Sequence, residues 1–257
     1  MPEENHKNGG QIGAWEAETL RATAFPSPDA QFDPTNWWSP VVGVAPETDV
    51  NNIKLGVKET QGTFSGARLS LNVQAARIDW TLTANPQVES PFSLLTLGNF
   101  EEKWPIFSEL LKKWFLLSPP LSRLAFGTIV YQPTEGKEDS YRRLQSYLPK
   151  VVLDPASSDF IYRINRPRKS KSGIEGLKIN RLSTWTAVRV HFAQFAPTPE
   201  GGMKGTRLVN PIDACRAEID VNTGQEYEGQ IGPEQSVQVF AELVELAREI
   251  LRKGDQP

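Results

Sequence analysis

Residues 99–131 read NFEEKWPIFSELLKKWFLLSPPLSRLAFGTIVY, and this stretch decides the fold class. Its first part repeats bulky apolar residues every three or four positions, which predicts an amphipathic helix from Asn99 to Leu117. A Pro-Pro pair ends this helix, because proline cannot continue its hydrogen bonding. Apolar residues alternate in the part that follows, which predicts a strand over residues 121–131.

The same two patterns extend outward in both directions. A second long apolar stripe predicts a helix over residues 233–252, and a shorter one predicts a helix over residues 137–148. Residues 26–51 are rich in proline, which predicts a long irregular segment. Alternation and β-favouring composition predict strands at residues 14–25, 53–59, 68–73, 77–84, 159–165, 177–182, 184–195 and 214–221.

This order of elements predicts an α+β fold in which an antiparallel sheet carries two long amphipathic helices on one face. We expect residues 13–257 to form a single domain. The alternative is two similar strand-rich halves, residues 13–118 and 119–257, each ending in a long helix. Residues 1–12 are polar and aperiodic, and we expect them to form a flexible N-terminus.

The composition is that of an ordinary folded protein. The 257 residues are 39% hydrophobic and 23% charged, with a formal net charge of -3. No apolar run reaches the ~20 residues that a membrane helix needs, and the N-terminus lacks the pattern of a secretory signal. We therefore expect a cytoplasmic protein without a membrane partner. Cys215 is the only cysteine, which excludes an internal disulfide.

Four segments between residues 66 and 252 resemble a sporadically distributed family of uncharacterised bacterial proteins of similar length. The segments are ARLSLNVQAARIDW at 67–80, EKWPIFSELLKKWF at 102–115, PPLSRLAFGTIVY at 119–131 and EIDV at 218–221. After the central helix the family pattern has a second Arg and an Asn, and residues 123–131 lack both. The resemblance implies no activity and no site residues. The patchy distribution of the family implies an association with mobile or defence genes.

The segment of residues 163–181 concentrates positive charge in a protein that is acidic overall. It contains seven basic residues and one acidic residue, Glu175. Such a cluster can neutralise phosphates, and Tyr162 beside it can stack on a base. The alternatives are a solvated hairpin tip and a contact with an acidic protein partner. The candidate partner-binding residues in this segment are Arg163, Arg166, Arg168, Lys169 and Lys171.

Trp37 and Trp38 are adjacent in the proline-rich segment. Exposed tryptophans often anchor protein interfaces, so both residues are further candidates for partner binding. The alternative is that they close the rim of the core, because tryptophan is highly buried on average.

Carboxylates offer a second kind of candidate site. Glu218 and Asp220 share one face of a predicted strand, and with Asp213 or Asp79 they could hold a divalent metal for phosphodiester cleavage. Alternating acids are also typical of the solvated face of an antiparallel strand, so we expect neither a metal site nor a cofactor. The motifs of serine hydrolases, P-loop NTPases and dinucleotide-binding enzymes are absent from the sequence.

These patterns favour binding over catalysis. The first hypothesis is a non-catalytic protein-binding or regulatory subunit of an intracellular bacterial complex, with the defence association that the resemblance implies. The second is a nucleic-acid-binding accessory protein that uses the basic segment of residues 163–181. The third is a metal-dependent nuclease at Asp213, Glu218 and Asp220.

Overall fold

The computed structural model of the protein describes residues 14–85, 93–197, 202–207 and 211–256. Its elements, in chain order, are β1 (Glu16–Pro26), η1 (Pro34–Asn36), α1 (Trp38–Val42), β2 (Thr48–Asn52), β3 (Val57–Phe64), β4 (Ala67–Gln74), β5 (Arg77–Thr83), α2 (Phe100–Phe115), β6 (Leu121–Thr134), α3 (Lys137–Tyr147), β7 (Ile161–Asn165), β8 (Arg168–Lys169), β9 (Lys178–Val190), β10 (Ala193–Pro197), β11 (Met203–Arg207), β12 (Ile212–Thr223) and α4 (Pro233–Lys253). The prediction of a mixed protein with a large antiparallel sheet is confirmed. The prediction for residues 1–12 lies outside the described residues.

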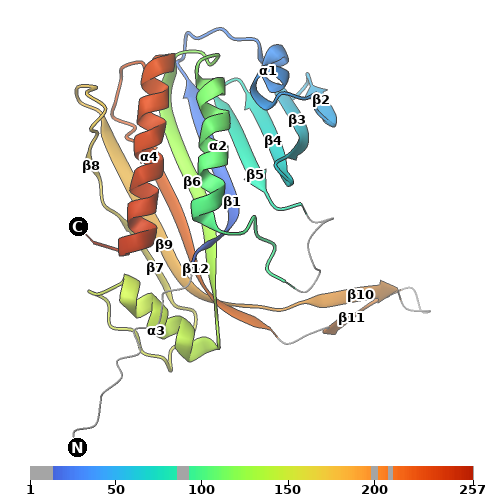
Figure 1. The fold of residues 1–257 in the computed structure, drawn as a ribbon, viewed down its shortest axis with the longest axis vertical. Helices are drawn as coiled ribbons and strands as arrows, with labels where there is room; N and C mark the ends of the chain where they lie inside the picture. The colour runs from blue at the N-terminus through green and yellow to red at the C-terminus, as the bar shows by residue number, and fades with distance from the viewer. Residues whose placement is uncertain (1–13, 86–92, 198–201, 208–210, 257) are drawn as a thin grey trace, which may run out of the picture.

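One ten-stranded sheet organises the molecule (Figure 1). Its order is β2-β3-β4-β5-β1-β6-β12-β9-β7, with β8 beside β9. The first strand of each sequence half, β1 and β6, lies in the middle, and the later strands follow outward in reverse chain order on both sides. On each side the strand next to the central pair, β5 or β12, leads along the chain to a long helix, α2 or α4. The single-domain and two-half descriptions of the chain both stay predictions.

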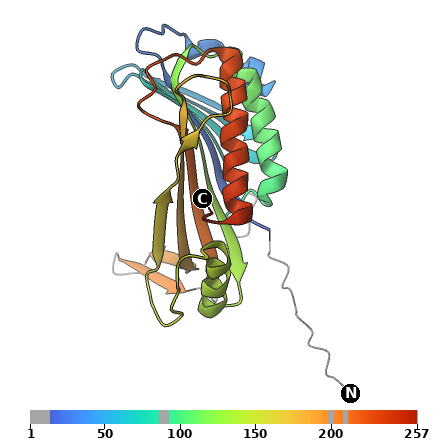
Figure 2. The same ribbon diagram turned by 90° about the vertical axis from the view of Figure 1, so that its left-hand side faces the viewer.

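The helices α2 and α4 lie side by side over the same face of the sheet (Figures 1 and 2). Phe115 of α2 lies against Phe240 of α4 with ring centroids 5.1 Å apart, and Phe126 of β6 lies 5.8 Å from Phe240. All three rings are buried, and burial of each stabilises the fold by about 1.5–3 kcal/mol. None of the described helices is both long enough and apolar enough to cross a membrane.

The first edge of the sheet differs from the prediction of a strand over residues 53–59. The structure has a turn at residues 53–56, between β2 and β3. The Asn52 side chain and the Asn52 carbonyl both accept a hydrogen bond from the Leu55 N–H at 3.2 Å. This local bonding favours a turn over a strand. The segment of residues 26–51, predicted to be irregular, also contains η1, α1 and most of β2.

The prediction of separate strands at residues 177–182 and 184–195 is wrong, because β9 runs without interruption through Ser183. Arg181 and Ser183 occupy buried positions on the core face, in line with Trp185. Two polar residues therefore interrupt the apolar alternation although the strand continues. The strands β10 and β11 form a hairpin that projects beyond the large sheet (Figure 1).

Candidate interaction surfaces

The basic segment of residues 163–181 lies at the β7 edge of the sheet, against the C-terminal end of the chain. Asp255 holds one end of this segment. Its carboxylate accepts hydrogen bonds from Tyr162 Oη at 2.7 Å and from Arg166 Nη2 at 2.8 Å, and it also pairs with Arg166 Nε. Asp255 is buried, and the hydrogen bonds from Arg166 hold the pKa of its carboxyl below the usual value.

Helix α4 holds the middle of the basic segment through Glu249. This carboxylate pairs with Arg168 at 3.3 Å and with the buried Arg181 at 3.9 Å. The pKa of Glu249 is lowered. Burial alone would raise it, but the positive charges of Arg168 and Arg181 have the larger combined effect. A large part of the positive charge in this segment is therefore neutralised within the molecule.

Helix α4 also holds the tip of the basic segment. Glu242 accepts hydrogen bonds from Ser170 Oγ at 2.6 Å and from the Lys171 N–H at 2.8 Å. Arg163, Lys169 and Lys171 are exposed, and within the described ranges none of these three side chains forms an ion pair. Of the five candidate basic residues, two are held by α4 and the C-terminus and three are accessible.

Trp37 and Trp38 are buried, with 5% and 4% of their surface exposed. Trp38 stacks on Trp80 of β5 at a centroid distance of 5.9 Å, and Trp37 meets the edge of Trp114 in α2 at 5.7 Å. These contacts fix the proline-rich segment to the core, which is the rim-closing role. Little of either side chain is accessible to a partner.

The carboxylates considered for metal binding each have a polar neighbour. The contacts are Asp79 with Arg77 at 2.6 Å, Asp213 with Arg189 at 2.8 Å, Glu218 with Arg216 at 3.4 Å, and Asp220 with Asn222 at 2.9 Å. In the part of the chain that the structure describes, no three Asp, Glu, His or Cys side chains group where they could hold a metal ion. These contacts therefore add no support to the nuclease hypothesis.

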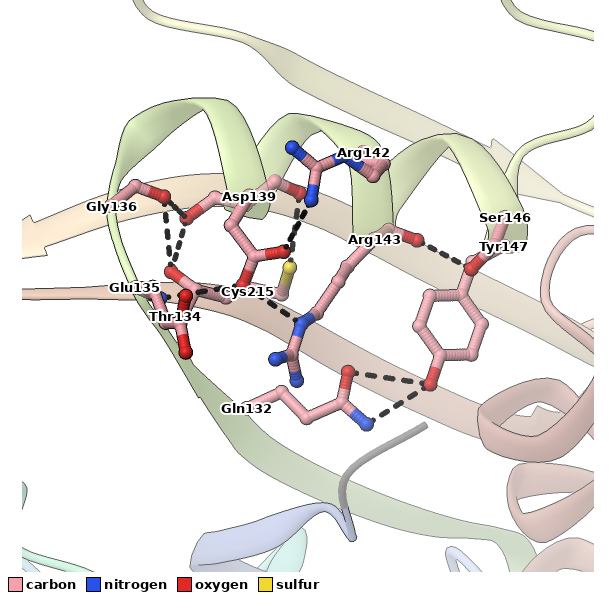
Figure 3. Close-up of polar contacts among 11 residues, drawn as sticks. Gln132, Thr134, Glu135, Gly136, Asp139, Arg142, Arg143, Ser146, Tyr147 and Cys215 are labelled. Carbon is pink, nitrogen blue, oxygen red and sulfur yellow. Dashed lines mark hydrogen bonds and ion pairs between the residues drawn. The ribbon is translucent and has the colours of Figure 1, made fainter. Parts of the chain in front are cut away.

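A polar cluster fixes α3 to the sheet (Figure 3). Gln132 of β6 donates a hydrogen bond to Tyr147 Oη at 3.1 Å, and both residues are buried. Asp139 faces two arginines on its own helix, Arg142 at 3.2 Å and Arg143 at 3.1 Å. Because the buried polar groups of Gln132 and Tyr147 bond to each other, their burial costs little free energy. The cluster therefore stabilises the packing of α3 on the sheet.

Cys215 of β12 lies beneath α3 in the same cluster (Figure 3). Its side chain is fully buried, and Sγ lies 3.2 Å from the Ser140 carbonyl oxygen. Burial raises the pKa of the Cys215 thiol to about 12, so the reactive thiolate is scarce at neutral pH. Cys215 is therefore a core residue.

The β2 edge carries an apolar surface that the sequence patterns do not single out. All five residues of β2 are exposed, and among the described strands only β3 pairs with it. Of the ten exposed large hydrophobic residues in the described ranges, four lie in this short region: Val44 at 57%, Val50 at 58%, Ile53 at 85% and Leu55 at 73%. The apolar residues were visible in the sequence, but alternation assigned Ile53 and Leu55 to a strand instead of an exposed turn.

A groove of about 700 Å³ lies beside this edge, and we call it the turn groove. One wall is the proline-rich stretch of residues 28–35, which includes Phe32. The lining also includes Ile53, Lys58 and Val73. Phe32 is held in place by stacking on Trp37 at 5.5 Å. The turn groove thus combines apolar walls with a small number of charged groups, which is typical of a binding surface.

Neither a family model nor a curated protein matches this chain.

Proposed function

We propose that this chain is a non-catalytic protein-binding or regulatory subunit of a complex in the bacterial cytoplasm, and that the turn groove receives its partner. The observation that supports this proposal is the position of two highly exposed apolar residues, Ile53 and Leu55, in the turn beside a concave surface. Exposed apolar surface bordered by polar groups marks interaction sites. The bacterial origin and the defence association rest on the sequence resemblance, and they are part of the same proposal.

The chemistry of the turn groove favours an extended protein segment with one or two apolar side chains. Phe32, Ile53 and Val73 offer apolar contact. Asp33 and Lys58 also line the groove with opposite charges, and Lys58 is paired with Asp49 at 3.4 Å. Because these two charges are opposite, the groove offers no net charge that would attract a strongly charged ligand. A partner protein is therefore a better fit to this surface than a nucleic acid.

The test is a comparison of tagged variants purified from the source organism at low salt. The wild-type chain is expected to retain a partner at fixed stoichiometry, identified by mass spectrometry. The double change Ile53→Ser and Leu55→Ser is expected to weaken that retention at least about tenfold, because it removes the two most exposed apolar side chains of the turn.

The matched control is Val152→Ser, since Val152 is 96% exposed but lies outside the turn groove. This variant is expected to retain the partner as the wild type does. Equal retention by the wild type and the double variant would contradict the proposed site. A wild-type chain that purifies alone would contradict the proposed function.

The accessible side chains of Arg163, Lys169 and Lys171 favour a second candidate function, nucleic-acid binding at the basic segment. The same purification tests it through the ratio of absorbance at 260 and 280 nm. Nucleic acid that is released as salt rises would support this alternative, because phosphate contacts weaken with ionic strength. Conversion of these three residues to Glu should then abolish the nucleic-acid signal.

A further inference from the structure

The outer side of β2 is an edge whose backbone groups lack a strand partner within the described residues. An edge strand presents a row of N–H and C=O groups that can pair with another strand. Natural edges are usually protected by charged residues, proline or a covering segment. The sequence of β2, TDVNN, has one charge, Asp49, which is already paired with Lys58 at 3.4 Å and bonded to Thr60 at 2.9 Å.

From this edge we propose that two copies of the chain associate by antiparallel pairing of β2 with β2, which joins their sheets into one. The proposal goes beyond the partner-binding function and does not depend on a partner in the turn groove. A twofold axis through Val50 sets Val50 opposite Val50, Asp49 opposite Asn51 and Thr48 opposite Asn52. No like charges are opposed in this register, and Asp49 meets an amide that can donate to it.

The residues around β2 support the same pairing. Val50 is 58% exposed, and its neighbour on β3 is Glu59, which lies on the same face of the sheet. Direct pairing would cover Val50 with its own copy, and apolar cross-strand pairs stabilise antiparallel sheets. Because the twofold axis of such a pair is perpendicular to the sheet, the α2–α4 layers of both copies would lie on the same side. The exposed Val44, between α1 and β2, would lie near the junction.

The other edge of the sheet does not suit this kind of pairing. A twofold axis through the middle of β7 would oppose Arg163 to Arg163, and directly opposed like charges destabilise a strand pair. Pairing of β2 with β7 of another copy would leave free edges at both ends and produce open chains. Pairing of β2 with β2 uses one surface twice and closes at two copies.

Sedimentation of the full chain at increasing concentration tests the proposal. The wild type is expected to reach a mass of twice 28.7 kDa. Val50→Lys would oppose two ammonium groups across the axis and is expected to weaken association at least about tenfold. Its unfolding transition should match that of the wild type, because Val50 is largely exposed in a single copy. Ile161→Lys changes an apolar residue of the β7 edge that is 68% exposed, and it should leave association unchanged.

A cross-link tests the register directly. Directly opposite residues of antiparallel strands have Cα atoms about 4.5–5.5 Å apart, which a disulfide can span. Val50→Cys is therefore expected to form a covalent dimer under mild oxidation, whereas the buried Cys215 of the wild type should not. Ile161→Cys is the control and should stay monomeric on a denaturing gel.

A wild-type chain that stays monomeric at every concentration would overturn the proposal. So would a dimer that Val50→Lys leaves intact. Both outcomes leave the partner-binding test at Ile53 and Leu55 unaffected, so failure of the dimer is distinguishable from failure of the proposed function.

Discussion

The two edges of the sheet are built in opposite ways. At the β7 edge, charged residues are numerous, and α4 and the C-terminus hold them through Asp255 and Glu249. At the β2 edge, the strand is fully exposed and the apolar residues beside it are left in solvent. A cluster of residues that stands out in the sequence is therefore not always the one that solvent can reach. Much of the positive charge of the basic segment is paired with carboxylates of the same chain. The β2 edge, which the sequence patterns do not single out, is exposed to solvent.

The largest effect is expected from Gly254→Ala at the β7 edge. Gly254 has a φ of 71°, and a Cβ at this position would overlap the Tyr147 carbonyl. The backbone cost and the overlap together should lower the free energy of unfolding by about 2–4 kcal/mol, as measured in urea. Gly173→Ala is the matched control, because Gly173 has a φ of 81° and open space around it. It should cost only about 1 kcal/mol, and equal losses would contradict a tightly held C-terminus.

A smaller effect is expected from Asp255→Asn. The change removes the negative charge that holds Arg166 and leaves Tyr162 with a weaker acceptor. The free energy of unfolding should fall by about 2 kcal/mol, since Asp255 is buried and Arg166 is only partly exposed. Asp29→Asn is the control, because Asp29 is exposed, and its effect should stay below about 0.5 kcal/mol. A loss of the same size in both variants would mean that the Arg166–Asp255 contact does not stabilise this edge.

The smallest effect is expected from mild acid. The pKa values of Asp255 and Glu249 lie below their usual values of 3.8 and 4.5 in the folded protein, so both groups bind protons less readily than in the unfolded chain. Their contribution is complete above about pH 4.5 and is lost as the pH falls through the folded pKa values. Urea unfolding between pH 7 and pH 3 should show a flat region and then a decline.

The Asp255→Asn variant sharpens the acid measurement. It lacks one of the carboxyl groups whose pKa is lowered in the folded protein, so its decline should be shallower and the difference from the wild type should shrink at low pH. A difference that stays constant from pH 7 to pH 3 would show that Asp255 acts through packing and not through its charge.

Regular packing made much of the fold predictable from the sequence. The stripes of α2 and α4 and the alternation in β4, β5 and β6 follow from one buried face per element, and this relation is local. The continuity of β9 was not predicted because Arg181 occupies a buried position, where it pairs with Glu249 of a distant helix. The turn at residues 53–56 was not predicted because its apolar residues are exposed to solvent, whereas apolar residues in an alternating pattern usually face the core.

The candidate surfaces show the same limit. The basic cluster at residues 163–181 is visible in the sequence, but its neutralisation is not, because Glu242, Glu249 and Asp255 lie more than sixty residues away along the chain. The adjacent Trp37 and Trp38 are equally visible, but their burial depends on Trp80 and Trp114 from other elements. Residue type indicated candidate positions, and long-range contacts decided which of them solvent can reach.

The sequence by itself determined that this protein is a mixture of helices and antiparallel strands, because the periods of its apolar residues are properties of neighbouring positions. Only the tertiary structure decided that β1 and β6 lie in the centre, that α4 pairs with part of the basic segment, and that the β2 edge is exposed. Strand order and ion pairing join residues that are distant in the chain. Local periodicity depends only on neighbouring positions, so it does not show which distant residues meet.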